Sequence, residues 1–276
     1  MKLPELLEML KAGVHFGHQS SRWHPKMAEY IYGVRGGVHV IDLEKTLAQL
    51  ERALTYVENV VARGGSIMFV GTKRQAQDIV AKYAQECGMP YVNTRWLGGT
   101  FTNFPQIQRL IKQYLDLKDK TEKGELKKYT KLEQLQFSRK IEELEDKIGG
   151  ISTMTRLPEA VFMLDARHDK TAVREALATK VKIVALCDSN VNPTGISYVI
   201  PANDDAIGSL DLMASLVAEA VKSGKAKAVA ATRAAAEARQ SAEDEVKLSD
   251  KSKATVDDLD DAMKEKLVAE AQEEKK

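Results

Sequence analysis

Residues 66–92 read SIMFVGTKRQAQDIVAKYAQECGMPYV, and this stretch decides the fold. It begins with a short apolar run, Ile67–Val70, which a glycine and a threonine separate from a helical pattern that continues through Cys87. A glycine and a proline follow where a helix should end, and Tyr91–Val92 predicts a second short strand. We therefore expect a βαβ unit with parallel strands and a right-handed connection.

Similar patterns occur on both sides of this stretch. Apolar runs at residues 161–164, 183–186 and 198–200 predict further strands, and periodic stretches at residues 43–61, 170–179 and 206–222 predict helices. Together these elements give about five mostly parallel strands with helices on both faces. We predict an α/β, doubly wound sheet of the flavodoxin or Rossmann kind.

The region before residue 43 has a different composition. Leucines at helical spacing predict a short helix within residues 3–10, and residues 14–27 are aperiodic, so that we expect no regular element there. Two alternating runs, residues 30–32 and 38–41, surround glycines and predict a β-ribbon with Arg35 at its tip.

Residues 105–150 carry two apolar stripes at helical spacing, separated by the polar turn TEKGEL. They predict an inserted antiparallel helical hairpin with coiled-coil packing that projects from the sheet. We expect an α/β domain at residues 1–104 and 151–225, the hairpin at 105–150, and an acidic, mobile tail at 226–276. The tail is rich in alanine and charge but poor in large apolar groups.

Charge and cysteine content restrict the class of protein. The formal net charge is +1, but from residue 229 onward there are nine Lys/Arg and thirteen Asp/Glu, so residues 1–228 carry 32 basic and 27 acidic groups. The body is mildly basic and the tail acidic. Cys87 and Cys187 are isolated, which indicates reduced thiols rather than a disulfide framework. The sequence shows no signal-type or membrane-spanning apolar stretch, and we expect a cytoplasmic protein.

Three histidines within ten residues raise the alternative of a metal site. His15 and His18, together with Asp188 and Asp204, are the candidate ligands if the fold brings them close together. No zinc-type spacing is complete, and neutral rings that stack or form hydrogen bonds in a polar loop explain the histidines better. A structural metal remains open, whereas a catalytic one is disfavoured.

An enzyme is the second alternative, since doubly wound sheets bind ligands at the carboxyl ends of their strands. Both the G-x-G-x-x-G and the P-loop patterns are missing, which leaves only a lone glycine turn with a lysine. Candidate acid–base groups follow the strands at Asp165, Asp188, Asn190, Asp204 and Asp205. Turn formation and helix capping account for them more simply.

Cations and aromatic residues alternate in several glycine-bearing loops, a combination that suits structured RNA. Cations neutralise phosphates, aromatic rings stack on unpaired bases, and glycines let a backbone come close. The RNA-contacting residues that we predict are His15, His18, Arg22, Trp23, His24, Lys26, Arg35, Lys73, Arg74, Arg95, Trp96, Asn103 and Arg109. Lys73 and Arg74 stand where a strand passes into a helix, a place that favours a phosphate.

Six stretches resemble the bacterial form of the universal small-subunit ribosomal protein two family. They are GVHFGHQSSRWHPKMAEYIYG, HVIDLEKT, FVGTKRQA, YVNTRWLGGTFTNF, GGISTMTRLPEAVFMLD and CDSNVNPTGISYVIPANDDAI, and they occur in family order across about residues 3–225. The helical insertion also resembles that of the bacterial and organellar branch, whereas the long acidic tail departs from the family pattern.

The resemblance implies a non-enzymatic constituent of the small ribosomal subunit that binds small-subunit rRNA at the junction of head and body and supports translation. The implied partners are neighbouring small-subunit proteins, including ribosomal protein one, with no membrane and no small-molecule substrate. Some family members bind zinc, so the resemblance keeps a zinc ion open as a cofactor. A free interaction module that uses the hairpin away from ribosomes is a further alternative.

Overall fold

The computed structural model describes residues 3–232. The chain divides into two units, Met1–Ala226 and Lys227–Lys276. Of the second unit only residues 227–232 are described, and they are helical. The predicted acidic tail therefore lies, beyond residue 232, outside the described residues. None of the described helices is both long enough and apolar enough to cross a membrane.

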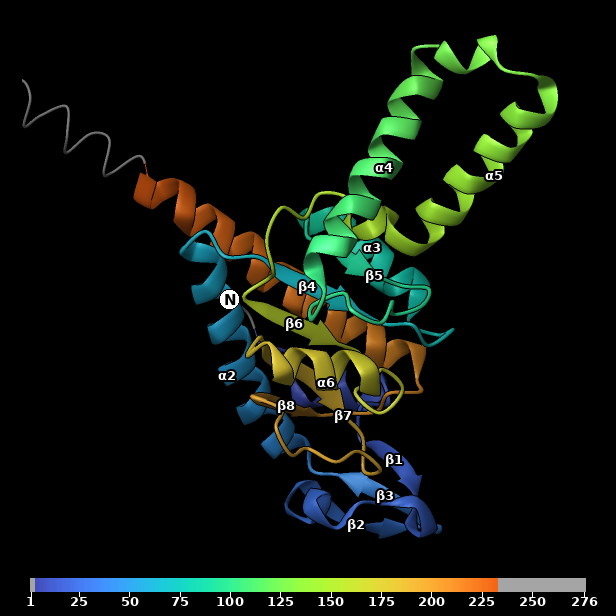
Figure 1. The fold of residues 1–276 in the computed structure, drawn as a ribbon. Coiled ribbons are helices and arrows are strands. Elements are labelled where there is room, and N and C mark those ends of the chain that lie inside the picture. The colour runs from blue at the N-terminus through green and yellow to red at the C-terminus, as the bar shows by residue number, and fades with distance from the viewer. Residues whose placement is uncertain (1–2, 233–276) are drawn as a thin grey trace, which may run out of the picture. The chain divides into compact units, whose positions relative to one another are not determined.

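A five-stranded sheet forms the centre of the first unit (Figure 1). Its strands are β4 (Ile67–Val70), β5 (Tyr91–Val92), β6 (Ala160–Met163), β7 (Lys182–Cys187) and β8 (Tyr198–Pro201), in the order β5-β4-β6-β7-β8. Every neighbouring pair is parallel. The predicted doubly wound α/β sheet of five strands is confirmed. From β4 the chain adds β5 on one side, and from β6 it adds β7 and β8 on the other, so the topological switch point lies between β4 and β6.

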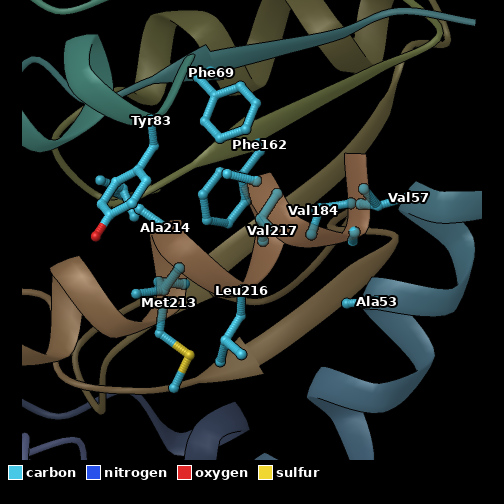
Figure 2. Packing of buried hydrophobic residues seen from close by; sticks show 14 of the residues in the cluster. Ala53, Val57, Phe69, Tyr83, Phe162, Val184, Met213, Ala214, Leu216 and Val217 are labelled. Atoms are coloured by element: carbon cyan, nitrogen blue, oxygen red, sulfur yellow. The ribbon is translucent and has the colours of Figure 1, made fainter. Parts of the chain in front are cut away.

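Helices cover both faces of this sheet. In β4, Ile67 and Phe69 join a core with α2 (Leu43–Ala62), α3 (Gln77–Cys87) and the helix that begins at residue 207. Met68 and Val70 alternate with them and pack on the other side, toward α6 (Lys170–Ala178). Figure 2 shows the first core, where Phe69 and Phe162 meet edge to face with 5.4 Å between ring centroids. All four β4 side chains are buried because both faces are covered.

The helix ends follow from local sequence. Asp42 caps α2, since its side chain accepts hydrogen bonds from the backbone N–H groups of Glu44 and Lys45 at 3.1 and 3.4 Å. Gly88 ends α3 in the left-handed conformation at φ +60°. Gly71 lets α3 approach β4, because a Cβ at this position would lie 2.6 Å from Val80 Cγ2.

A separate three-stranded antiparallel ribbon precedes α2. Its order is β1-β3-β2, formed by β1 (Phe16–Gln19), β2 (Ile31–Arg35) and β3 (Val38–Ile41), and it follows the short helix α1 (Leu6–Lys11). The absence of regular structure predicted for residues 14–27 is wrong, because the segment contains β1 and two 3-10 turns, Ser20–Arg22 and Pro25–Tyr30. The register of β1 on β3 shifts between Phe16 and Gln19, so the apolar alternation that reveals a strand is lost.

The insertion consists of α4 (Phe104–Glu122), a 3-10 turn (Glu125–Lys128) and α5 (Lys131–Ile148), and α4 contacts α5 (Figure 1). Thr130 and Glu133 form a reciprocal capping box at the start of α5. Ile107, Ile111 and Tyr114 of α4 are buried against the second core. Leu132 and Leu135, by contrast, are exposed. The coiled-coil packing of the two helices stays a prediction.

Candidate nucleic-acid interface

The carboxyl ends of the five parallel strands meet at one edge of the sheet, which we call the carboxyl edge. The loops that leave this edge begin at Gly71, Asn93, Leu164, Asp188 and Ala202. Arg74 follows β4, and Arg95 follows β5, and both side chains are exposed. The fold thus brings to one edge two of the cations that the sequence predicts as RNA contacts.

The histidine-rich segment joins the same edge. The backbone N–H groups of His18 and His24 donate to the hydroxyl and carbonyl oxygens of Ser189, at 2.9 and 2.8 Å. Because Ser189 follows β7, these two bonds fasten β1 and the turn after it beside the carboxyl end of that strand. Gly17 permits the contact, since a Cβ there would lie 2.9 Å from Ser189 Oγ.

The turn after β1 exposes a cation and an indole ring. Arg22 is exposed, and Trp23 is 41% exposed with its ring 5.2 Å from that of His39. Lys26 extends to Thr194, whose hydroxyl its ammonium group contacts at 2.6 Å. His24 Nδ1 accepts the backbone N–H of Lys26 and so shapes the turn. The arrangement provides a stacking face and free guanidinium donors side by side.

Lys73, unlike the exposed Arg74 beside it in the sequence, is largely buried among carboxylates. Its ammonium group lies 2.6 Å from Asp205, 3.0 Å from Asp204 and 3.3 Å from Asp165, and its side chain is 18% exposed. Burial alone would lower the pKa of Lys73, but the three carboxylates together raise it. The expectation that Lys73 points outward to a phosphate is wrong, because three carboxylates already hold its charge.

Next to this ion pair lies a group of possible metal ligands. His18, Asp188 and Asp204 each offer one ligand atom, and the three atoms lie within 4.8 Å of one another. His18 Nδ1 is 2.9 Å from Asp188 Oδ2, and this contact raises the pKa of the imidazole. Burial, followed by the charges of Asp165 and Asp188, raises the pKa of Asp204. The buried carboxylates thus outnumber the cations around them.

The fourth residue predicted for the metal is elsewhere. His15 borders an apolar hollow between α1 and the ribbon, and its ring lies 4.0 Å from that of Phe16. Burial lowers the pKa of His15. The structure therefore brings together His18, Asp188 and Asp204 but not His15, which is also turned toward the ribbon rather than the carboxyl edge.

The loop between β5 and α4 does not offer the predicted indole face. Trp96 is 8% exposed, packs edge to face on Phe101, and donates its indole N–H to Glu175 at 3.1 Å. The expectation that Trp96 stacks on a base is wrong for this reason. Arg95 and Asn103, at the two ends of the loop, are exposed. Arg109 is exposed on α4, and Arg35 is exposed at the tip of the ribbon.

Asp165, a candidate for acid–base chemistry, and the neighbouring Asn203 accept hydrogen bonds from the backbone. Asp165 Oδ1 accepts the N–H groups of Arg167 and His168, both at 2.8 Å. Asn203 Oδ1 accepts the N–H groups of Asp205 and Ala206 at 2.7 and 3.0 Å and so caps the helix that begins at residue 207. These bonds agree with the turn and capping explanation of the acidic residues.

Sequence reasoning missed several residues at this edge. Arg167 and His168 are exposed directly after β6, and Arg174 is exposed on α6. Their signal was the position after a predicted strand, the same one that identified Arg74. Glu175 was missed because nothing in its own helix distinguishes it from an ordinary surface acid. The hydrogen bonds that its carboxylate accepts all come from residues more than seventy positions away.

Comparisons with known proteins show what the chain is similar to. The family model described as ribosomal protein S2 matches residues 9–224. Proteins described as small ribosomal subunit protein uS2 from Francisella tularensis subsp. novicida (strain U112) and subsp. tularensis (strain WY96-3418) are 49% identical over 214 residues. A third, from subsp. holarctica (strain FTNF002-00 / FTA), is equally similar. Each alignment covers 78% of this chain and 90% of the relative.

Proposed function

Because the chain belongs to the ribosomal protein S2 family, whose members are structural and non-enzymatic, we propose that it binds small-subunit rRNA at the junction of head and body. The protein is a structural constituent of the small ribosomal subunit and acts there in translation. Its RNA-contacting surface is the carboxyl edge of the sheet. In this role it is ribosome-bound in the cytoplasm and uses no substrate.

The observation that carries the proposal is the meeting of exposed cations at the carboxyl edge. Arg74 and Arg95 follow β4 and β5, and Arg22 lies in the turn that the His18 and His24 amides fasten to Ser189, after β7. A rigid sheet holds the loops at fixed spacing, so the guanidinium groups can match phosphates along one RNA backbone. Trp23 adds a ring on which an unpaired base can stack.

The residues at the centre of the carboxyl edge favour a structural role over catalysis. Folds of this topology bind nucleotides at the switch point, which here lies between β4 and β6. Lys73 and Asp165 follow these two strands and form an ion pair at 3.3 Å, so the position of a nucleotide phosphate is already taken by a carboxylate. This arrangement supports a structural role.

The proposal is tested by the salt dependence of binding. Full-length protein is added back to small subunits that lack it, and the dissociation constant is measured at several salt concentrations. Arg74→Ala/Arg95→Ala should weaken binding and reduce the slope of log K against log salt by about 2, since each lost phosphate contact removes about one unit.

Arg63→Ala/Lys182→Ala is the matched control. Both side chains are exposed at the opposite edge, beside the amino ends of β4 and β7, and the double variant loses the same charge. It should retain the slope of the unmodified protein. An equal loss of slope in both double variants would mean that binding depends on net charge and not on the carboxyl edge.

Binding of a divalent cation is a second function that we propose for the carboxyl edge. Zinc is the ion that the family resemblance suggests. The observation that favours it is the convergence of His18 from β1 with Asp188 and Asp204 from the loops after β7 and β8, together with the surplus of buried carboxylates. An imidazole and two carboxylates suit zinc. A bound cation would offset their charge and fasten β1 to the ends of β7 and β8.

Metal analysis of the purified protein tests this function. The protein, after dialysis against zinc and then against buffer alone, should retain about one zinc ion per chain. His18→Ala/Asp188→Asn should lose it, whereas His15→Ala should retain it, because His15 lies outside the group of ligands. Equal zinc content in the two variants would contradict the assignment.

Ribosomal protein one is the protein neighbour that we assign to an apolar groove between α1 and the ribbon. The groove has a hollow of about 770 Å³. A second hollow of about 510 Å³ shares Leu10 and Tyr32 with it and extends the groove along α1. The exposed apolar side chains on the walls of the two hollows are Leu6, Leu7, Leu10, Phe16, Tyr32 and Val34. Tyr32 is 82% exposed, and an apolar patch of this kind is typical of a protein interface.

Subunits assembled with Leu7→Ser/Tyr32→Ser test the assignment. The variant should enter small subunits in normal amounts, because the carboxyl edge is unchanged, but these subunits should contain less ribosomal protein one. A normal content of ribosomal protein one in these subunits would exclude the groove as its attachment site.

A further inference from the structure

Glu175 binds five donors from a single loop. It lies in α6 and is 8% exposed. Its Oε1 accepts the indole N–H of Trp96 at 3.1 Å and the backbone N–H of Gly99 at 2.8 Å. Its Oε2 accepts the backbone N–H groups of Phe101 and Thr102 at 2.9 and 3.3 Å, and the Thr102 hydroxyl at 3.4 Å. The loop of residues 96–102 therefore wraps around this one carboxylate.

The charge of this carboxylate is balanced without a salt bridge in the described part of the chain. Backbone N–H groups that point at one centre form an anion-binding concavity, of the kind that usually holds a phosphate. Here the anion is Glu175, which is supplied by the protein. The N–H groups of Gly99, Phe101 and Thr102 are therefore not free for RNA, and phosphate contacts from this loop must come from its side chains.

The two exposed residues predicted to bind RNA flank this arrangement. Arg95 directly precedes Trp96, and Asn103 directly follows Thr102. Asn103 is also the residue before α4, and its side chain makes no capping hydrogen bond to that helix. Gly99 takes φ +91°, so the chain can turn back on itself between the two ends.

We propose that Glu175 is a positioning residue for RNA binding, because it shapes the 96–102 loop into the conformation that presents Arg95 and Asn103 to the RNA backbone. The inference deepens the proposed function and rests on it. Glu175 itself touches no RNA. Its role is to fix in advance a loop that would otherwise lose conformational entropy on binding.

A double-mutant cycle tests the inference with full-length protein and small subunits that lack it. Arg95→Ala should weaken binding about tenfold, the loss of one charge-assisted hydrogen bond. Glu175→Gln keeps the shape of the side chain but replaces an acceptor by a donor that faces N–H groups. It should weaken binding by at least the same factor, because Asn103 depends on the same loop. The double variant should be no weaker than Glu175→Gln, because that change already removes the contact of Arg95.

Glu159→Gln is the matched control. Glu159 also accepts a backbone N–H, from Ser66 at 2.6 Å, but it lies before β6 at the opposite edge of the sheet. Binding by Glu159→Gln should be unchanged. The fluorescence emission of Trp96 reports on the conformation of the loop. Trp23 is the other tryptophan of the chain and would contribute to the spectrum. In a Trp23→Phe background, used for the spectrum alone, Glu175→Gln should shift this emission to the red as the indole meets water.

The outcomes separate this inference from the proposed function. If Arg95→Ala binds normally, the role of Arg95 in the proposed function fails, and the positioning of Arg95 fails with it. If Arg95→Ala binds weakly but Glu175→Gln binds normally despite a red shift, only the positioning role is overturned. Independent, additive losses from the two changes would also overturn it, since they would show that Glu175 stabilises the protein without directing Arg95.

Discussion

Lys73 and Arg74 show how two adjacent cations acquire different roles. The sequence assigns both to a phosphate, and nothing in the residues around them separates the two. The fold turns Lys73 inward, where Asp165, Asp204 and Asp205 lie within 3.3 Å of its ammonium group, and leaves Arg74 exposed. The partners of Lys73 are 92 or more positions away in the chain, which is why sequence reasoning could not find them.

The two residues should therefore fail in different ways when each is replaced by alanine. Lys73→Ala leaves buried carboxylates unpaired and should lower the free energy of unfolding by about 3–5 kcal/mol. Arg74→Ala should change it by less than about 0.5 kcal/mol, as exposed substitutions do, but should weaken binding to the subunit. Urea unfolding and subunit binding measure the two effects. A stability loss of equal size in both variants would contradict the assignment.

The lowered pKa of Glu175 determines in which direction the stability of the protein changes with pH. Burial alone would raise the pKa of Glu175, but the N–H groups of Phe101, Gly99, Trp96 and Thr102 lower it below its ordinary value of 4.5. A carboxyl group whose pKa is lower in the folded state stabilises the protein above the ordinary pKa. This stabilisation is lost as the pH falls through the lower, folded-state value.

The unmodified protein should therefore be more stable than Glu175→Gln at pH 7, and the difference between their free energies of unfolding should shrink on acidification below about pH 4.5. Urea unfolding of both proteins across this pH range provides the measurement. A difference that stays constant, or grows, as the pH falls would show that the ionised carboxylate does not hold the loop.

At the scale of elements, the ribbon depends on one close approach. Gly17 in β1 faces Ser189, and an added Cβ would lie 2.9 Å from Ser189 Oγ and 3.0 Å from the carbonyl oxygen of His39. Gly17→Ala should therefore push β1 away from the end of β7 at a cost of about 1–3 kcal/mol. Hydrogen exchange of the His18 and His24 amides should become faster.

Gly33→Ala is the control for this prediction, because it lies on β2 of the same ribbon and a Cβ there meets nothing within 4 Å. In Gly33→Ala, the His18 and His24 amides should exchange at the rate of the unmodified protein. If both alanine variants loosen the His18 and His24 amides equally, the contact between Gly17 and Ser189 is not what holds the ribbon to the sheet.

The inserted helices should divide into a base that stabilises the body and a tip that does not. The buried residues Ile107, Ile111 and Tyr114 lie in the first half of α4 or at its middle, and the buried Ile148 is the last residue of α5. Ile111→Ala should lower the free energy of unfolding by about 2–5 kcal/mol. Replacing residues 118–140 by a short glycine–serine linker should leave it within about 1 kcal/mol of the unmodified protein.

Calorimetry of the two variants checks this division. A large loss of stability in the shortened protein would mean that the tip also packs on the body, whereas a stable Ile111→Ala variant would mean that the base does not contribute to the core.

Which elements could be predicted depends on how much of their pattern is local. The strands β4, β6 and β7 are covered on both faces, so nearly every residue is apolar and the run is visible in the sequence. The helix α2 shows its buried face through apolar residues three and four apart. In contrast, β1 has a shifted register and is partly exposed, and its attachment to Ser189 is more than 160 residues away in the chain.

At the scale of the whole molecule, the sheet topology brings residues from different loops together at one edge. Parallel strands deliver all their carboxyl ends to one edge, so residues that follow different strands meet there even though the chain separates them widely. This rule explains why Arg74 and Arg95, both predicted as RNA contacts, come to the same edge. It could not separate the cations that face outward from Lys73, or the exposed Trp23 from the buried Trp96, because burial depends on partners that the sequence pattern does not specify.

The carboxyl edge therefore combines an acidic interior with a cationic rim. Asp165, Asp188 and Asp204 are buried behind the rim, and Arg22, Arg74 and Arg95 are exposed on it. The interior ion pairs hold the loops in place, and the rim is left to meet a phosphate backbone. The central claim is that this edge, and not the opposite one, faces rRNA.

Site-specific photo-crosslinking on intact small subunits tests that claim most directly. A photoreactive benzoylphenylalanine is placed singly at Arg74, Arg95, Arg63 or Lys182, and the subunits are irradiated and analysed for protein joined to RNA. The probes at Arg74 and Arg95, on the carboxyl edge, should crosslink to small-subunit rRNA, and those at Arg63 and Lys182, on the amino edge, should not. RNA crosslinks from the amino edge with none from the carboxyl edge would contradict the account.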